Sequence, residues 1–171
     1  MPFGNTRTVF EQEKYKILKA SSRDAPIVSA LTKGDWSERV AISQRRKIDN
    51  PTQIAEDLRA GGGLVLYRGS LPVAALSYVH ARDGSWELRR LGVTRTYSGR
   101  GFTTLLLDTL EKLALKAEVR SIRIPVETYS PQYKAYFEKL GFSVDTDRTF
   151  STVFAGALQP IRMRKVVSQQ A

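Results

Sequence analysis

The stretch that decides the fold is 91-LGVTRTYSGRGFTTLLL-107. An apolar segment ends at Val93, a short polar turn follows, and Gly99 and Gly101 lead directly into a leucine-rich segment. The first turn of a helix leaves backbone N–H groups unpaired and carries the positive end of the helix dipole. Glycines let an anion approach these groups closely, and Arg100 adds a cation at the same place. The stretch predicts a strand, a turn and a helix whose N-terminus suits a pyrophosphate, although a Gly-x-Gly at such a junction can also be only a tight turn.

Apolar patterns on both sides of this stretch predict a mixed sheet. Strands are expected over residues 14–20, 64–67, 73–80, 86–93 and 122–126, and around 143–154 and 158–166. Helices are expected over residues 25–31, about 99–117 with one apolar stripe, and 133–140, whereas 35–48 fits either a helix or an irregular arm. A further helix, 51–58, is expected to begin at Asn50-Pro51 and to end at the glycines 61–63, and residues 82–84 are expected to form a hairpin turn. This order favours an α/β fold with a mixed, mostly antiparallel central sheet of about seven strands and helices on both faces. Residues 14–166 are expected to form one domain, between a flexible N-terminal segment (1–13) and a C-terminal tail (167–171).

The composition excludes several kinds of chemistry. The chain has 171 residues, no cysteine and a single histidine, His80. Disulfides, thiol nucleophiles, cysteine-based metal sites and histidine clusters are therefore excluded, and no metal is expected. No G-x-S-x-G segment accompanies His80, and neither the P-loop pattern nor the dinucleotide pattern G-x-G-x-x-G occurs. What remains is chemistry by positioning and by backbone dipoles.

The net charge is +10. Such a charge favours anionic partners, namely a phosphorylated cofactor, nucleic acid or an acidic protein, but a basic protein can also be merely soluble. No signal peptide and no apolar run of about 20 residues is present. A cytoplasmic protein without a membrane partner is expected.

Three segments stand in an order and at distances that are typical of one family. They are residues 91–93 with 97-YSGRGFT-103, 137-FEKLGF-142 and 161-IRMRK-165. They resemble the pyrophosphate signature [QR]-x-x-G-x-[GA], the hexapeptide Y-E-K-L-G-F and the M-x-K of the last strand in the GCN5-related N-acetyltransferases, the GNAT superfamily. The resemblance covers about residues 14–166. Ser98 stands where the family has Gln or Arg, and Thr103 where it has Gly or Ala.

The resemblance implies acetyl-CoA as the donor, held where the fourth and fifth expected strands (86–93 and 122–126) splay apart. Pro125 suits such a splayed edge, and Gly92 suits a bulge in the fourth strand. Backbone N–H groups near 91–93 would polarise the thioester carbonyl. The candidate cofactor-binding residues are Leu91, Gly92, Val93, Ser98, Gly99, Arg100, Gly101, Phe102, Thr103, Ser130 and Phe137.

The same resemblance implies direct attack of a neutral amine on the thioester, without an acyl-enzyme. Glu87 is the candidate general base, acting through a water, and the alternative is an exposed strand residue paired with Arg89, Arg90 or a neighbouring strand. Phe137 occupies the position of the tyrosine that commonly protonates the departing thiolate. Tyr136 is the nearest hydroxyl and the candidate acid, and Tyr133 is the next, although the place of both on an apolar helix face favours core packing. Water is the alternative proton source.

The function expected is transfer of the acetyl group of acetyl-CoA to an amine acceptor. The acceptor is a small molecule or a peptide or protein amine, and the charge of +10 adds an acidic or RNA-linked acceptor such as aminoacyl-tRNA. The alternative is a non-catalytic acyl-CoA-binding sensor or partner-binding module on the same fold. The chain is expected to be a monomer or a homodimer.

Overall fold

The computed structural model describes residues 7–33, 50–126, 131–145 and 161–167. The elements in chain order are β1 (Thr8–Gln12), β2 (Tyr15–Ala20), the 3-10 turn η1 (Ser22–Asp24), α1 (Ala25–Thr32), α3 (Pro51–Ala60), β3 (Gly61–Arg68), β4 (Leu71–His80), β5 (Trp86–Val93), the 3-10 turn η3 (Arg95–Tyr97), α4 (Phe102–Lys116), β6 (Ser121–Val126), α5 (Pro131–Lys139), β7 (Ser143–Val144) and β8 (Ile161–Val166).

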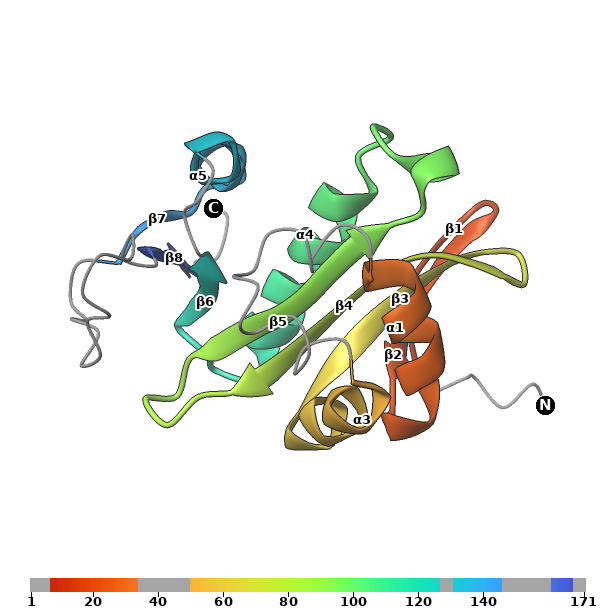
Figure 1. Ribbon diagram of the computed structural model, residues 1–171, viewed down its shortest axis with the longest axis horizontal. Helices are drawn as coiled ribbons and strands as arrows, with labels where there is room; N and C mark the ends of the chain where they lie inside the picture. Colours follow the sequence, from red (N-terminus) through yellow and green to blue (C-terminus); the bar gives the residue numbers. More distant parts are fainter. Residues whose placement is uncertain (1–6, 34–49, 127–130, 146–160, 168–171) are drawn as a thin grey trace.

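The strands form one eight-stranded sheet in the order β1-β2-β3-β4-β5-β6-β8-β7 (Figure 1). Strands β5 and β6 are the parallel pair, and every other neighbouring pair is antiparallel. The expected α/β class with a mixed, mostly antiparallel sheet is confirmed. The strand count exceeds the expected seven because residues 8–12, assigned above to a flexible segment, form β1 and pair with β2.

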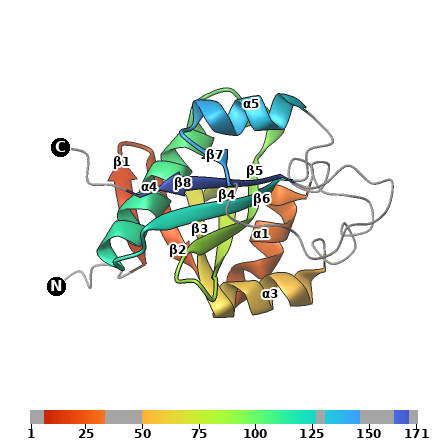
Figure 2. The same ribbon diagram turned by 90° about the vertical axis from the view of Figure 1, so that its left-hand side faces the viewer.

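Helices lie on both faces of the sheet (Figure 2). On one face, Val28 and Leu31 of α1 and Ile54 and Leu58 of α3 pack with Val65 and Ala75 of the sheet. On the other face, α4 contributes Leu106, Leu107 and Leu110 to a larger core that α5 joins through Phe137. Burying a leucine side chain stabilises the fold by about 2 kcal/mol. These two cores fix the sheet between the helix pairs and hold α4 along β5.

The start of α3 confirms the expected cap, but its end differs from the expectation. Asn50 Oδ1 accepts a hydrogen bond from the Thr52 amide at 2.9 Å, and Pro51 is the first helical residue. The three glycines 61–63 do not form a loop after the helix; they begin strand β3 and pair with residues 77–79 of β4. A Cβ at Gly61 would lie 2.1 Å from the Tyr78 carbonyl oxygen, so close backbone approach explains the glycine there.

Two strands are described at the end of the chain. Of the strand predicted around 143–154, the described residues include β7 at Ser143–Val144, and of the strand predicted around 158–166 they include β8 at Ile161–Val166. The expectations for residues 35–48 and for the segment 146–160 lie outside the described residues. Within the described part of the chain, no helix has both the length and the apolar character that crossing a membrane requires.

Candidate functional site

Strands β5 and β6 are joined at one end and open at the other. They pair only at Trp86↔Ile122 and Glu87↔Arg123, although β5 continues to Val93. Figure 1 shows β6 turning away from β5 beyond this point. Pro125 lies past the last of these pairs, opposite Arg162 of β8, so the expected position of a proline at a splayed edge is observed. The six remaining residues of β5 run for about 20 Å along the gap.

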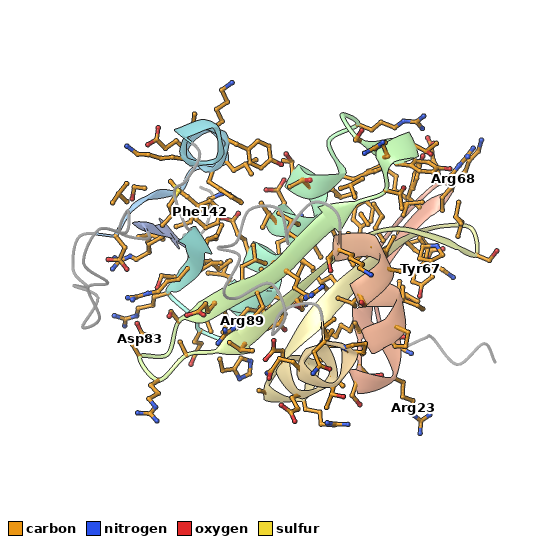
Figure 3. All side chains as sticks on the ribbon, viewed as in Figure 1. Arg23, Tyr67, Arg68, Asp83, Arg89 and Phe142 are labelled. Atoms are coloured by element: carbon orange, nitrogen blue, oxygen red, sulfur yellow. The ribbon has the colours of Figure 1, made fainter. Side chains whose placement is uncertain are left out.

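A buried arginine fastens the closed end of this gap. Arg123 of β6 lies with Nη2 2.8 Å from Asp83 Oδ2 and with Nη1 3.2 Å from Asp145 Oδ2. Asp83 belongs to the β4–β5 hairpin (Figure 3), and Asp145 follows β7. Arg123 is 8% exposed, and so is Asp145. One side chain therefore ties the hairpin and the C-terminal strands together where β5 and β6 meet.

The glycine turn lies at the other end of β5. Gly99 (φ +75°) and Gly101 (φ +81°) are exposed, and a Cβ on either would meet no atom within 4 Å. Gly101 is the N-cap of α4 and provides no side-chain cap, and the first intrahelical bond runs from the Leu105 amide to the Gly101 carbonyl at 3.0 Å. The amides of residues 102–104 precede that bond. Open space over glycine backbone at an uncapped helix start fits a phosphate group.

An aromatic cluster supports this turn from below. Tyr97, buried at the end of η3, contacts Phe102 of α4 at a ring distance of 6.1 Å, and Phe102 contacts Tyr15 of β2 at 5.0 Å. Arg68 Nη1 donates to Tyr97 Oη at 3.0 Å, and this hydrogen bond raises the pKa of Arg68. The guanidinium of Arg100 lies 4.8 Å from the centre of the Tyr97 ring. The turn is thus held by ring packing as well as by its glycines.

Strand β5 presents alternate residues to the two faces of the sheet, with one irregularity. Ser77 and Tyr78 of β4 pair with Arg90 and Leu88, which leaves Arg89 as an extra residue. The bulge expected at Gly92 therefore lies at Arg89. Gly92 pairs regularly with Ala75, and a Cβ there would lie 2.3 Å from the Leu31 carbonyl oxygen of α1. Close packing of α1 on the strand, not a bulge, requires this glycine.

The same strand carries a buried arginine that the sequence indicated only as a possible partner of Glu87. Arg90 is 2% exposed, and its Nη1 donates to Thr32 Oγ1 at 2.7 Å, on the α1 side of the sheet. Thr32 Oγ1 in turn donates to the Val28 carbonyl at 2.7 Å. From the sequence, an arginine close to Arg89 and Glu87 is expected to be exposed on the strand. The bulge at Arg89 instead places the Arg90 side chain under the C-terminal end of α1, where a cation complements the helix dipole.

Glu87 lies at the closed end of the gap. It stands opposite Arg123 in the ladder, and its Oε1 lies 3.4 Å from Arg89 Nη2. Leu91 is four residues further along the strand, which corresponds to about 13 Å. The structure therefore keeps Glu87 apart from the glycine turn and pairs it with Arg89, but its side chain is 16% exposed and not fully exposed as the alternative expects. Its role as a base stays a prediction.

The acetyltransferase (GNAT) family model matches residues 28–142. The chain belongs to this family. The match includes β5, the glycine turn and α5, so membership covers the elements that build the open end of the gap. It also confirms the resemblance and the acyltransferase class stated above.

Solved structures agree with the family in fold. PaiA N-acetyltransferase from Thermoplasma acidophilum, solved in complex with coenzyme A, has 17% identity and a TM-score of 0.69, with 90% of this chain and 99% of that chain covered. Ard1 from Thermoplasma volcanium has 14% identity and a TM-score of 0.71, covering 92% and 100%. The ribosomal-protein-S18-alanine N-acetyltransferase from Escherichia coli has 18% identity and a TM-score of 0.63, covering 92% and 96%. A comparison with curated proteins finds no match.

Helix α5 of this GNAT domain places its two aromatic candidates differently. Phe137 is 1% exposed and contacts Phe142 edge-on at 5.9 Å, so it is part of the core beneath the helix. Tyr136 is half-buried and packs edge-on against Phe137 at 5.2 Å. Ser130 and the side chain of Tyr133 lie outside the described residues. Both side chains lie on one helix, and the ring contacts described for them run to each other and to Phe142.

Proposed function

We propose that this GNAT domain binds acetyl-CoA in the gap between β5 and β6 and transfers the acetyl group to an amine. The observation that carries the proposal is the open end of the gap. There the parallel ladder stops after Glu87↔Arg123, and the exposed backbone of Gly99 and Gly101 begins helix α4. A helix start of this kind binds a pyrophosphate through backbone N–H groups. Thr103 adds a hydroxyl donor and Arg100 a guanidinium to the same turn, whereas the Ser98 hydroxyl donates to the Arg95 carbonyl at 2.9 Å.

The open edge of β5 suits the activation of a carbonyl. Beyond Glu87 this edge has no strand partner among the described residues, so alternate N–H groups along β5, that of Leu91 among them, point toward the gap. A fixed N–H group that donates to a developing oxyanion lowers the barrier by about 3 kcal/mol. We assign this role to the backbone at Leu91–Val93, and the pantetheine arm of the donor to the same edge.

Direct transfer moves one proton away from the amine and one proton onto the leaving thiolate. The amine nitrogen forms its bond to the acetyl carbon while the carbon–sulfur bond breaks, and no cysteine is present to form an acyl-enzyme. We assign the base to Glu87, which at this distance reaches the amine only through a chain of several waters, and the acid to Tyr136. Phe137 has no hydroxyl and takes part only by packing against the site.

The first experiment is calorimetric titration of the protein with acetyl-CoA, followed by thiol release with a panel of amines. Saturable micromolar binding with amine-dependent thiol release supports the proposal. Binding without thiol release for any amine, peptide or charged tRNA would instead favour the non-catalytic sensor, the second candidate that buried Phe137 favours. Failure to bind at millimolar acetyl-CoA would contradict both.

The salt dependence of acceptor binding tests which class of acceptor the protein uses. An RNA-linked acceptor releases counterions from its phosphates, so its binding weakens steeply with salt, whereas a small neutral amine binds almost independently of salt. Because a net charge of +10 favours an anionic acceptor, the salt dependence should be measured with aminoacyl-tRNA. A cytoplasmic monomer or homodimer stays a prediction, which fractionation and light scattering test.

A further inference from the structure

A second cationic feature lies beside the glycine turn, on the outer side of Tyr97. The Tyr97 hydroxyl accepts from Arg68, and the Arg100 guanidinium lies over the Tyr97 ring. Because both groups contact the same side chain, two guanidinium groups from distant parts of the sequence lie close together. Their positions are set by a buried ring that also packs on Phe102, the first residue of α4.

These two arginines have no carboxylate partner among the described residues. Both side chains are exposed, and neither forms an ion pair in the part of the chain that the structure describes. Arg95, on the same turn, is also exposed and unpaired within those residues. Like charges held close together repel each other, and a bound dianion relieves this repulsion. The arrangement therefore suits a ligand that carries two negative charges on one group.

Coenzyme A carries such a group. Its pyrophosphate oxygens have one negative charge per phosphorus, whereas its ribose 3′-phosphate is a terminal monoester with up to two charges and three strong acceptor oxygens. Guanidinium groups match such oxygens with paired, charge-assisted hydrogen bonds. Backbone N–H groups at the helix start suit the pyrophosphate, and a pair of guanidiniums beyond the turn suits the terminal phosphate one ribose away.

We infer that Arg68 and Arg100, positioned by Tyr97, bind the 3′-phosphate of the donor, so that this chain selects the 3′-phosphorylated thioester over its dephosphorylated form. The inference rests on the proposed function, since it assumes that acetyl-CoA is the donor. It adds a residue of β3, Arg68, to a site otherwise built from β5 and α4. It also gives Arg100 a specific ligand group.

The test compares the affinities of acetyl-CoA and 3′-dephospho-acetyl-CoA by calorimetry at constant ionic strength. The wild-type chain is expected to bind acetyl-CoA roughly tenfold to a hundredfold more tightly than the dephospho form. In the double variant Arg68→Met, Arg100→Met this ratio is expected to fall to about one. The affinity for acetyl-CoA should fall much more than the affinity for the dephospho form, which loses only the contribution of Arg100 at the pyrophosphate.

Two further variants separate local binding from general charge. Arg23→Met removes the same charge from an exposed site far from Arg68 (Figure 3), and the ratio should stay at the wild-type value. Tyr97→Phe keeps the ring below Arg100 but removes the acceptor that holds Arg68, so the ratio should fall to an intermediate value. Thermal unfolding of each variant shows whether the fold is intact.

The outcomes distinguish failure of the 3′-phosphate site from failure of the proposed function. Equal affinity of the wild-type chain for both thioesters, or a ratio that survives in the double variant, would overturn this inference and leave the proposed function standing. A ratio that Arg23→Met lowers as much as the double variant does would also overturn it, because total charge would then be the cause. If neither thioester binds, the proposed function fails and this inference fails with it.

Discussion

The two ends of helix α4 satisfy their backbone groups in opposite ways. At the C-terminal end, the Val119 amide donates to the Ala114 carbonyl at 2.8 Å and the Glu118 amide to the Leu115 carbonyl at 3.1 Å, with Glu118 in the left-handed region at φ +61°. This is a Schellman closure, built without a glycine. At the N-terminal end, Gly101 adopts φ +81° and no side chain caps the helix. The C-terminal end of α4 is thus closed by a residue in a strained conformation, whereas the N-terminal end is left without a side-chain cap.

The β5–β6 pair shows the same contrast. Its closed end has two ladder pairs and the buried Arg123 between two aspartates, whereas its open end has no ladder and faces the glycine turn. The C-terminal end of α4 and the paired end of β5 and β6 lie away from the proposed donor, whereas the N-terminal end of α4 and the unpaired end of β5 face it. Unsatisfied backbone groups are costly unless water or a ligand meets them, so their position marks a binding site more directly than any single side chain does.

The largest effect is expected from filling the space at the N-terminal end of α4. Gly101→Glu puts a side chain and a negative charge where the pyrophosphate is proposed to bind, and acetyl-CoA affinity should fall at least a hundredfold, by about 3 kcal/mol. Gly84→Glu is the matched control, because Gly84 has φ +84° and the same open space, but lies in the β4–β5 hairpin. Calorimetry compares the two. Unchanged affinity in Gly101→Glu would remove the turn from the site.

The next largest effect is expected from removing the ion pairs at the paired end of β5 and β6. Arg123→Met removes the cation shared by Asp83 and Asp145, and the free energy of unfolding should fall by about 3 kcal/mol, because a buried carboxylate then loses its partner. Lys134→Met, which breaks the exposed pair with Glu138, should cost less than about 0.5 kcal/mol. Urea unfolding measures both. Equal losses in the two variants would mean that Arg123 is no more important than a surface ion pair.

A smaller effect tests whether the closed end takes part in the reaction. Glu87→Gln should lower kcat about tenfold to a hundredfold if this carboxylate removes the amine proton through water, with acetyl-CoA affinity unchanged. The pH–rate profile should change, since glutamine cannot accept the proton. A profile identical to that of wild type would assign Glu87 to its ion pair with Arg89 alone.

The smallest effect sharpens the contrast between the ends of α4. Glu118→Gly relieves a left-handed residue that has a Cβ and should stabilise the fold by about 0.5–1 kcal/mol. Thermal unfolding measures the gain, and acetyl-CoA affinity should not change. A loss of stability would show that the Glu118 side chain contributes more than its backbone strain costs.

Several local features could be predicted because their causes lie within a few residues of one another. The cap Asn50-Pro51, the hairpin around Gly84 and the apolar stripe of α4 are local patterns, and the structure agrees with each. The glycine turn was predicted for the same reason. Strand β1 was missed because its residues pair only with β2, and a strand stabilised by one neighbour leaves a weak alternation in its own residues.

The amino-acid sequence by itself determined the element order, the family resemblance and the glycine turn, because periodicity, caps and motifs are written in neighbouring residues. Tertiary structure alone decided which distant side chains meet. The contact of Arg68 with Tyr97, the burial of Arg90 under α1 and the place of Arg123 between Asp83 and Asp145 depend on strand register, a bulge and sheet order. Gly92 shows the limit of local inference: the glycine was noticed, but its cause is the carbonyl of Leu31, which only the packing of α1 on β5 brings within reach.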